Sequence, residues 1–249
     1  MAIELRDIHK AFGPKEVLRG FSAEARDGET LVILGGSGSG KSVTLKHIVG
    51  LLDPDRGEVW VDGLRVDELD REGLFDLRRN VGYVFQFAAL FDSMTVAENV
   101  GMGLKRLKGV SKEERARRVE ECLERVEMAG YGDRLPAELS GGQKKRIGIA
   151  RAIATEPRYI LYDEPTTGLD PMTRAVIDTL INRMKEELGV TGIVITHDME
   201  SAFRVADRFA MIHDGKRQFE GTPDEIRASE DPMVRAFIEG RPELIEEAG

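Results

Sequence analysis

The stretch GGSGSGKSVTLKHIVGLL, residues 35–52, is a glycine-rich turn that runs directly into a segment with apolar residues at helical spacing. The apolar run LVIL at residues 31–34 precedes it and is typical of a strand buried on both faces. Glycines permit backbone conformations that other residues rarely adopt, and they let backbone amides approach an anion closely. A buried strand, a glycine-rich turn and a helix in this order predict a phosphate site at the helix N-terminus.

The turn fits the P-loop pattern GxxxxGK(S/T), which here runs from Gly35 to Ser42. We expect the Lys41 ammonium to reach the terminal phosphates of a nucleotide, and the Ser42 hydroxyl to join the shell of a bound Mg²⁺. The alternative is a flexible Gly/Ser connection, but the strand and the helix on either side favour the P-loop. The predicted nucleotide-binding residues of this turn are Gly35, Gly36, Ser37, Gly38, Ser39, Gly40, Lys41, Ser42 and Val43.

A second candidate site follows the apolar run YILYD at residues 159–163, where Asp163 and Glu164 come at the end of a predicted buried strand. In open α/β sheets, ligands bind just outside the carboxyl ends of the strands. We predict that Asp163 holds Mg²⁺ directly or through water, and that Glu164 polarises the attacking water as general base. The alternative is an acidic pair that merely begins a loop, which the presence of a P-loop in the same chain disfavours.

The order of predicted elements indicates an α/β fold. Strands and helices alternate along most of the chain, which implies a mostly parallel sheet with helices on both faces. The segment at about 87–155 changes character and is predicted to be a helical insertion. Strands are predicted at residues 2–9, 16–25, 31–34, 58–61, 81–85, 159–163, 192–196 and 209–212, and helices after residue 40, from Ser111 and at 172–188.

Composition excludes several classes of function. The 249 residues carry a net charge of −9, so we predict no nucleic-acid partner with a broad electrostatic footprint. The single cysteine, Cys122, excludes an intrachain disulfide and is predicted to be a small buried apolar residue. The N-terminus lacks the apolar core of a signal peptide, and no apolar run approaches the roughly 18 residues that span a bilayer. A role at a membrane therefore requires another chain as anchor.

The stretch LSGGQ at residues 139–143 separates the possible kinds of nucleotide protein. Ser140 can cap the helix that follows, and Gly141 and Gly142 leave its first amides uncovered, which would make a second anion site. A capped helix start without a ligand is the alternative. Three further residues occur with this stretch in the order that one family shows. Gln86 follows a predicted strand, Asp170 follows the acidic pair, and His197 follows the next predicted strand.

By these motifs the sequence resembles the nucleotide-binding subunit of ABC transporters over roughly residues 2–240. The resemblance implies a P-loop NTPase fold with a mostly parallel core sheet, an antiparallel β subdomain and the α-helical insertion at about 87–155. The ABC ATPase domain would occupy residues 1–240, with a short tail at 241–249. ATP and Mg²⁺ are the implied cofactors, and ATP hydrolysis would drive transport from the cytoplasmic face of the inner membrane.

The resemblance also assigns roles to single residues. Phe12 would stack on adenine, Gln86 would sense Mg²⁺ and the coupled membrane domain, and His197 would lie near the γ-phosphate. Each has an alternative, because Phe12 could pack its loop, Gln86 could cap a strand end and His197 could be a satisfied loop histidine. The implied catalytic residues are Glu164, His197 and Gln86, the Mg²⁺ ligands Ser42, Gln86 and Asp163, and the signature and D-loop residues Ser140, Gly141, Gly142, Gln143 and Asp170.

In this family two domains associate head to tail, with ATP between the P-loop of one copy and the signature helix of the other. A second copy of this chain is therefore the first implied partner, and hydrolysis would loosen the contact. An integral membrane permease is the second. Four apolar residues around the Q-loop would form a groove for its coupling helix, unless they pack in the core: Phe85, Phe87, Leu90 and Phe91.

A narrower resemblance connects the sequence to the ATPase of Mla/Mce phospholipid transporters, the toluene-tolerance type. It rests on GGSGSGKSVTLKHI, VFQFAALFDSMTVAENV and the tail helix DPMVRAFIEG at 231–240, and on the choice of Gly36 and Val43. It implies phospholipid trafficking between inner and outer membrane, with an MCE-domain protein and possibly a STAS-domain protein in the complex. Two other functions stay open: the ATPase of a small-solute importer, and a soluble ABC protein in translation, repair or cluster assembly.

Overall fold

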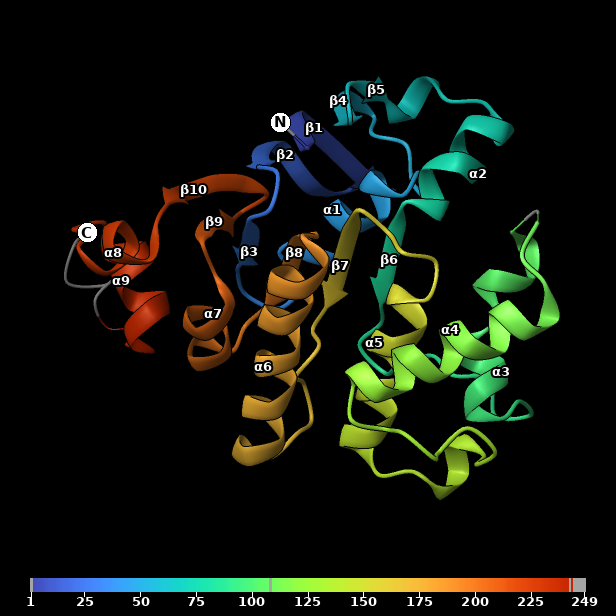
Figure 1. Cartoon of the computed structure of the whole chain (residues 1–249). Coiled ribbons are helices and arrows are strands. Elements are labelled where there is room, and N and C mark those ends of the chain that lie inside the picture. Colours follow the sequence, from blue (N-terminus) through green and yellow to red (C-terminus); the bar gives the residue numbers. More distant parts are fainter. Residues whose placement is uncertain (1, 108, 242, 244–249) are drawn as a thin grey trace. The chain divides into compact units, whose positions relative to one another are not determined.

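The computed structural model describes residues 2–107, 109–241 and 243, and it divides into two compact units that we describe separately (Figure 1). We call residues 1–75 and 191–249 the P-loop unit, and residues 76–190 the signature unit. The fold is that of an α/β P-loop protein with mixed sheets and helices, as the sequence predicts.

An antiparallel sheet opens the P-loop unit. Its strands follow the order β2-β1-β4-β5. Alternation at the start of β1 buries Ile3 and Leu5, and a register shift before Ile8 buries that residue as well, which confirms the predicted half-buried strand. The strands are β1 (Ile3–Phe12), β2 (Lys15–Ala25), β4 (Arg56–Val61) and β5 (Leu64–Arg65).

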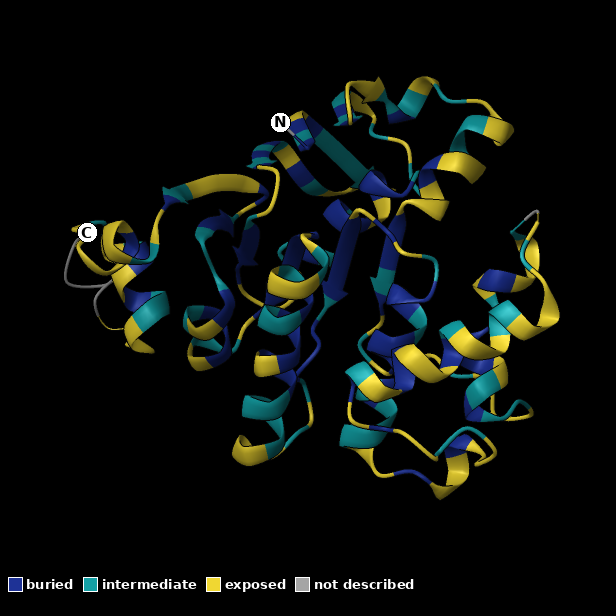
Figure 2. Cartoon of the chain, viewed as in Figure 1, coloured by how far each residue is buried: buried dark blue, intermediate teal, exposed yellow. Residues whose placement is uncertain are grey.

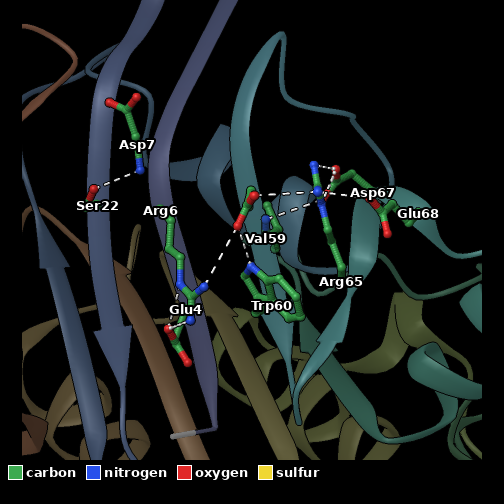
Figure 3. Close-up of polar contacts among 10 residues, drawn as sticks. Glu4, Arg6, Asp7, Ser22, Val59, Trp60, Arg65, Asp67 and Glu68 are labelled. Carbon is green, nitrogen blue, oxygen red and sulfur yellow. Dashed lines mark hydrogen bonds and ion pairs between the residues drawn. The ribbon is translucent and has the colours of Figure 1, made fainter.

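The outer face of this sheet carries a network of ion pairs (Figure 3). The Arg6 guanidinium lies 5.1 Å from the centroid of the Trp60 ring and 2.6 Å from Glu4. The indole N–H of Trp60 donates to Glu58 at 2.9 Å. Because these side chains are partly exposed, each ion pair adds little to the stability of the fold. The main effect of the network is to keep the outer face of an open sheet, which has edge strands, polar.

A second group of strands in the P-loop unit carries the phosphate site. β3 (Thr30–Leu34) pairs in parallel with β8 (Thr191–Thr196) on one side and with β9 (Arg208–His213) on the other. β10 (Lys216–Gly221) joins β9 in antiparallel orientation. Every residue of β3 and β8 is buried, as their continuous apolar runs predict (Figure 2).

Helices complete the P-loop unit: α1 (Lys41–Ile48), η1 (Val66–Glu68), α7 (Met199–Val205), α8 (Pro223–Arg227) and α9 (Pro232–Glu239), while α2 (Arg71–Arg79) crosses the boundary between the units. The helix expected in the tail at 231–240 is α9, and Asp231 caps it. Val234 and Ala236 are buried, and α9 contacts α8 and β10. A role of α9 in contacts between subunits stays a prediction.

The signature unit has β6 (Val81–Val84) and β7 (Tyr159–Asp163) as a parallel pair, with Val84 opposite Tyr162. The helical segment predicted at 87–155 contains α3, α4 and α5. α5 is central, because it contacts β6 and each of the other α-helices of the unit. The helices are α3 (Val96–Val100), η2 (Gly103–Arg106), α4 (Lys112–Arg125), η3 (Pro136–Glu138), α5 (Gly141–Ile153) and α6 (Pro171–Leu188).

Polar side chains cap the helices of the signature unit. Ser111 accepts a hydrogen bond from the amide of Glu114 and begins α4, as the sequence predicts. Cys122 is buried on α4, and burial raises the pKa of its thiol to about 11. Throughout the part of the chain that the structure describes, each helix is too short or too polar to cross a lipid bilayer.

Candidate functional site

The phosphate turn owes its shape to two glycines. At Gly35 (φ 157°) an added Cβ would lie 2.6 Å from the Ile212 carbonyl oxygen. At Gly40 (φ 105°) it would lie 2.8 Å from a methyl group of Leu18. The backbone oxygen of Ile212 excludes a Cβ at Gly35, and the positive φ of Gly40 is one that other residues rarely adopt, so both ends of the turn favour glycine. By contrast, nothing lies within 4 Å of the Cβ position of Gly36, so glycine is not required there by space.

The Lys41 side chain folds back into the turn. Its buried ammonium donates to the carbonyl oxygens of Gly35, at 2.7 Å, and Gly36, at 3.0 Å. α1 begins at Lys41, so the positive end of its dipole lies at the turn. The Ser39 hydroxyl is buried and has no hydrogen-bond partner among the residues that the structure describes. A buried orphan hydroxyl is rare, and a phosphate oxygen would satisfy it, so the turn fits a nucleotide phosphate.

Two more predicted residues lie in the P-loop unit near the turn. Thr196 pairs with Leu34 across β8 and β3, so the exposed His197 leaves the same sheet edge as Gly35. Phe12 ends β1 and is 46% exposed, with the Lys10 ammonium 5.9 Å from the centroid of its ring. Its ring is therefore accessible for stacking and is not packed inside its loop.

A hollow of about 590 Å³ adjoins the phosphate turn within the P-loop unit. Its walls are the phosphate turn at residues 36–39, Pro14 with the start of β2 at residues 15–17 and 19, and the end of β9 with the turn after it at residues 212–215. Lys15, Arg19 and His213 bring basic groups to these walls, and Glu16 and Asp214 bring acidic ones. The turn is thus reached from an open, mixed-charge surface.

In the signature unit, hydroxyl groups orient the two acidic residues. The Tyr83 hydroxyl donates to the Asp163 carboxylate at 3.0 Å, and burial raises the pKa of this phenol, so it stays a donor. The Thr167 hydroxyl donates to the Glu164 carboxylate at 2.9 Å. Glu164 is only 8% exposed and has a left-handed backbone (φ 49°), which is strained for a residue other than glycine. Sequence reasoning did not predict Tyr83 or Thr167.

The signature stretch forms the predicted capped helix start. The Ser140 hydroxyl accepts from the Gln143 amide at 3.3 Å, and the Gln143 side chain accepts from the Ser140 amide at 2.9 Å. Gly142 is required by space, because an added Cβ would lie 2.5 Å from a methyl group of Thr173. Asp170 caps α6 through the Thr173 amide at 3.1 Å, so the signature and D-loop segments lie together.

Two cationic side chains of α5 hold the segment that follows β6. The Lys145 ammonium donates to the carbonyl oxygens of Gln86 and, at 3.2 Å, Glu164. Arg151 donates to the carbonyl oxygens of Ala88, at 2.6 Å, and Ala89, at 2.7 Å. Burial lowers the pKa of Lys145 to about 8, and the nearby carboxylates oppose that shift. Neither cation was predicted, since nothing in the sequence ties α5 to this segment.

The aromatic residues around Gln86 are exposed. Phe87 is 81% exposed, and Phe85 and Phe91 also rank among the exposed large hydrophobic residues of the described chain. Leu90 is partly buried. The alternative of core packing is therefore wrong for the three phenylalanines, whose rings are available to a partner.

The predicted Mg²⁺ ligands come from both units. Ser42 belongs to the P-loop unit, whereas Gln86 and Asp163 belong to the signature unit. Within the described residues, no group of three or more His, Cys, Asp and Glu side chains is arranged to hold a metal ion. This donor set, one hydroxyl, one amide and one carboxylate, suits Mg²⁺ bound with phosphate oxygens and water, and not a cage built from protein alone.

Comparisons with known proteins agree with these motifs. A family model described as "ABC transporter" matches residues 18–167. The sulfate/thiosulfate import ATP-binding protein CysA of Caulobacter vibrioides is 43% identical over 242 residues, covering 96% of this chain and 70% of that protein. The protein TRIGALACTOSYLDIACYLGLYCEROL 3, chloroplastic, of Arabidopsis thaliana is 40% identical and covers 96% of this chain and 73% of that protein.

Other relatives are named as import ATP-binding proteins for methionine and for spermidine/putrescine. Among solved structures, a dimeric ATP-binding cassette in a post-hydrolysis state bound to ADP and Pi matches with a TM-score of 0.81 at 36% identity. That match covers 88% of this chain and 98% of the other. The fold is thus shared with an ATP-binding cassette that is bound to the products of ATP hydrolysis.

Proposed function

Because this chain belongs to the ABC transporter family of ATP-binding proteins, we propose that its ATPase powers the import of a small solute through a membrane permease. The chain binds ATP with Mg²⁺ and hydrolyses the ATP. The observation that carries the solute proposal is the naming of several relatives as sulfate/thiosulfate, methionine and spermidine/putrescine import proteins. These names favour a small solute over the phospholipid that the narrower sequence resemblance implied.

We assign ATP binding to the P-loop unit. The backbone amides of residues 35–43 cradle the phosphates, and Lys41 exchanges its carbonyl partners for phosphate oxygens. The orphan hydroxyl of Ser39 donates to the same phosphates. Phe12 stacks on the adenine, and His197, at the same sheet edge as the turn, contacts the γ-phosphate.

We assign hydrolysis to the strand ends of the signature unit. Glu164 acts as general base toward water, with its carboxylate fixed by Thr167. Within this unit, Asp163 and Gln86 would hold a bound Mg²⁺, which would neutralise the developing phosphate charge. Burial of Glu164 keeps the base in a site with little water, where its orientation has most effect.

A second copy of the chain completes the site in this proposal. Ser140, Gly141, Gly142 and Gln143 of one copy would face the ATP on the P-loop of the other, with Asp170 beside them. The dimeric state of the related cassette supports this arrangement. The exposed Phe87 and its aromatic neighbours would receive the permease, which places the chain at the cytoplasmic face of the inner membrane as a peripheral subunit.

Phospholipid trafficking is the second candidate, because one relative at 40% identity is named after the lipid trigalactosyldiacylglycerol. An MCE-domain protein, and possibly a STAS-domain protein, would then join the complex. Gly36 has open space around it, so its identity is not dictated by the fold and can reflect ancestry. For Val43, only the sequence resemblance supports a connection with phospholipid transport.

Purification from native membranes tests these candidates. The tagged chain is extracted in detergent with its partners, and the complex is identified and reconstituted in liposomes. We expect an integral permease to co-purify and ATP hydrolysis to rise with a solute-binding protein loaded with sulfate, methionine or spermidine. Stimulation by an MCE-domain protein and phospholipid instead would overturn the solute proposal, and absence of any permease would favour a soluble ABC protein.

A further inference from the structure

The central helix of the signature unit contacts the catalytic segment through a side chain that has no part in the proposed function. We propose that Lys145 is a positioning residue for ATP hydrolysis, whose ammonium ties the backbone of Gln86 to the backbone of Glu164. The inference rests on the assignment of Glu164 as general base. It adds a residue outside the signature stretch and outside the strand ends to the catalytic arrangement.

The geometry gives Lys145 two anchors on neighbouring strands. Gln86 comes shortly after β6, and Glu164 comes directly after β7, its parallel neighbour. The Lys145 ammonium donates to the carbonyl oxygens of both residues. A single side chain on α5 therefore spans the carboxyl ends of two adjacent strands, where the metal ligand and the base leave the sheet.

Burying the Lys145 ammonium costs free energy unless hydrogen-bond acceptors and negative charges compensate for the lost water. Lys145 is 5% exposed, and a buried ammonium without partners would be strongly unfavourable. Two carbonyl oxygens accept its hydrogen bonds, and the carboxylates of Glu164 and Asp163 attract its charge. The partners that stabilise the cation are thus parts of the catalytic segment, so the cation and that segment hold each other in place.

Backbone strain explains why the segment needs such support. Glu164, Ala88 and Ala89 have left-handed conformations, with φ of 49°, 58° and 47°. Non-glycine residues in this region cost on the order of 1–3 kcal/mol each and persist only where surrounding contacts fix them. Lys145 holds the peptide of Glu164, and Arg151, two turns further along α5, holds the two alanines.

The residue midway between the two cations lets α5 approach the segment after β6 closely. Gly148 lies on the same face of α5, three residues from Lys145 and three from Arg151. A Cβ added there would lie 3.5 Å from the Cβ of Ala88, so the helix backbone and the segment are already close. Removing the Lys145 donor would take this hydrogen bond from the Gln86 carbonyl and leave the Glu164 carbonyl with the weaker 3.3 Å bond from the Thr167 amide, so Glu164 would be freer to relax from its strained conformation.

The experiment compares steady-state ATP hydrolysis by the full chain carrying Lys145→Met or Lys145→Gln. Methionine fills a similar volume without a donor, and glutamine keeps two N–H donors. We expect Lys145→Met to lower kcat by about tenfold, the equivalent of leaving a buried hydrogen-bonding group unpaired. The KM for ATP should stay within about twofold, because uniform binding of the substrate is unaffected.

Glutamine should restore at least about half of the parental kcat, since it can donate to both carbonyl oxygens. Lys144→Met is the matched control, because it removes the neighbouring lysine of the same helix, which is only partly buried, and should leave kcat unchanged. Thermal unfolding midpoints of all variants show whether an effect on kcat arises from loss of the folded state.

Two results would overturn the inference: a Lys145→Met protein with kcat within about twofold of the parent, or a folded Lys145→Gln protein that falls as far as Lys145→Met. If Lys145→Met does not fold, Lys145→Gln decides alone, and a tenfold loss of its kcat overturns the inference while retention supports it. Glu164→Gln separates the two proposals. If Glu164→Gln retains turnover, the assignment of Glu164 as general base is wrong. If Glu164→Gln loses turnover but Lys145→Met keeps it, only the proposed role of Lys145 is wrong.

Discussion

In the P-loop unit, Gly35 and Gly40 shape the phosphate turn, because a side chain would clash with backbone at Gly35 and would be strained by the positive φ at Gly40. In the signature unit, the residues assigned to chemistry are held by side chains: Tyr83 orients Asp163 and Thr167 orients Glu164. One unit therefore binds with backbone shape, and the other positions its catalytic groups with buried donors. We therefore expect the two units to be sensitive to different kinds of substitution. Added bulk should damage binding in the first, and a lost donor should damage turnover in the second.

The largest effect is expected for Gly35→Ala. The new methyl group would overlap the Ile212 carbonyl oxygen and demand a φ that alanine avoids, so the turn must open. We expect ATP affinity to fall by at least about a hundredfold, as when a site loses several phosphate contacts at once. Gly36→Ala, whose Cβ meets open space, should lose far less. Equal losses in a nucleotide-binding titration would mean that the backbone shape at Gly35 has no special role.

A smaller and different effect is expected for Thr167→Val, which removes a donor without changing the shape of the side chain. The Glu164 carboxylate loses its 2.9 Å hydrogen bond, so kcat should fall by about fivefold, or about 1 kcal/mol. The KM for ATP should hardly change. Thr167→Ser keeps the hydroxyl and should recover most of the activity. A rise in KM at constant kcat would place Thr167 in binding and not in the orientation of the base.

Cys122 gives a pH-dependent effect confined to the signature unit. Burial raises the pKa of its thiol from the ordinary 9.0 to about 11, so the folded state favours the protonated form. Its contribution to stability is full below pH 9 and is lost as the pH rises through 11. Between these values the unfolding midpoint of the parent should fall faster than that of Cys122→Ala, in parallel thermal melts. Curves that stay parallel would show that the thiol ionises without cost in the folded chain.

The smallest effect is expected on the outer face of the antiparallel sheet (Figure 3). Arg6→Ala removes an exposed ion pair with Glu4 and the contact with Trp60. Because the pair is exposed and screened, unfolding free energy should drop by about 0–1 kcal/mol. Trp60 is the single tryptophan of the sequence, so its emission reports directly on this face during denaturant unfolding. A loss well above that range would mean that the ion pairs act as a connected network.

The same contrast explains what the sequence could predict. The P-loop, the strand YILYD and the capped helix after LSGGQ are local patterns, and the structure confirms them at nearly the expected bounds. Among the elements that were not predicted, β5 has only two residues, β10 has a mostly polar sequence without alternation, and α2 is a polar helix that buries only Leu77. Tyr83 and Lys145 could not be identified either, because each acts on a residue that only the fold brings near. Thr167 lies three residues after Glu164, but the sequence does not show that its hydroxyl turns back to that carboxylate.

The identity of the transported substrate is a different case. The narrower resemblance connects Gly36 and Val43 with lipid transport, but the open space around Gly36 places no demand on that residue. Nothing in the phosphate turn contacts a transported molecule, so no physical link leads from these residues to cargo. The names of the relatives shift the balance toward small solutes.

The division between binding and chemistry is tested most directly by measuring ATP affinity and phosphate release on the same preparation of Glu164→Gln. Glutamine keeps the shape of the side chain and can still accept from Thr167, but it cannot take a proton from water. We predict that turnover falls by at least about a hundredfold while ATP affinity stays within about threefold of the parent. Turnover within several-fold of the parent would contradict the account, because the signature unit would then lack the base on which it is built.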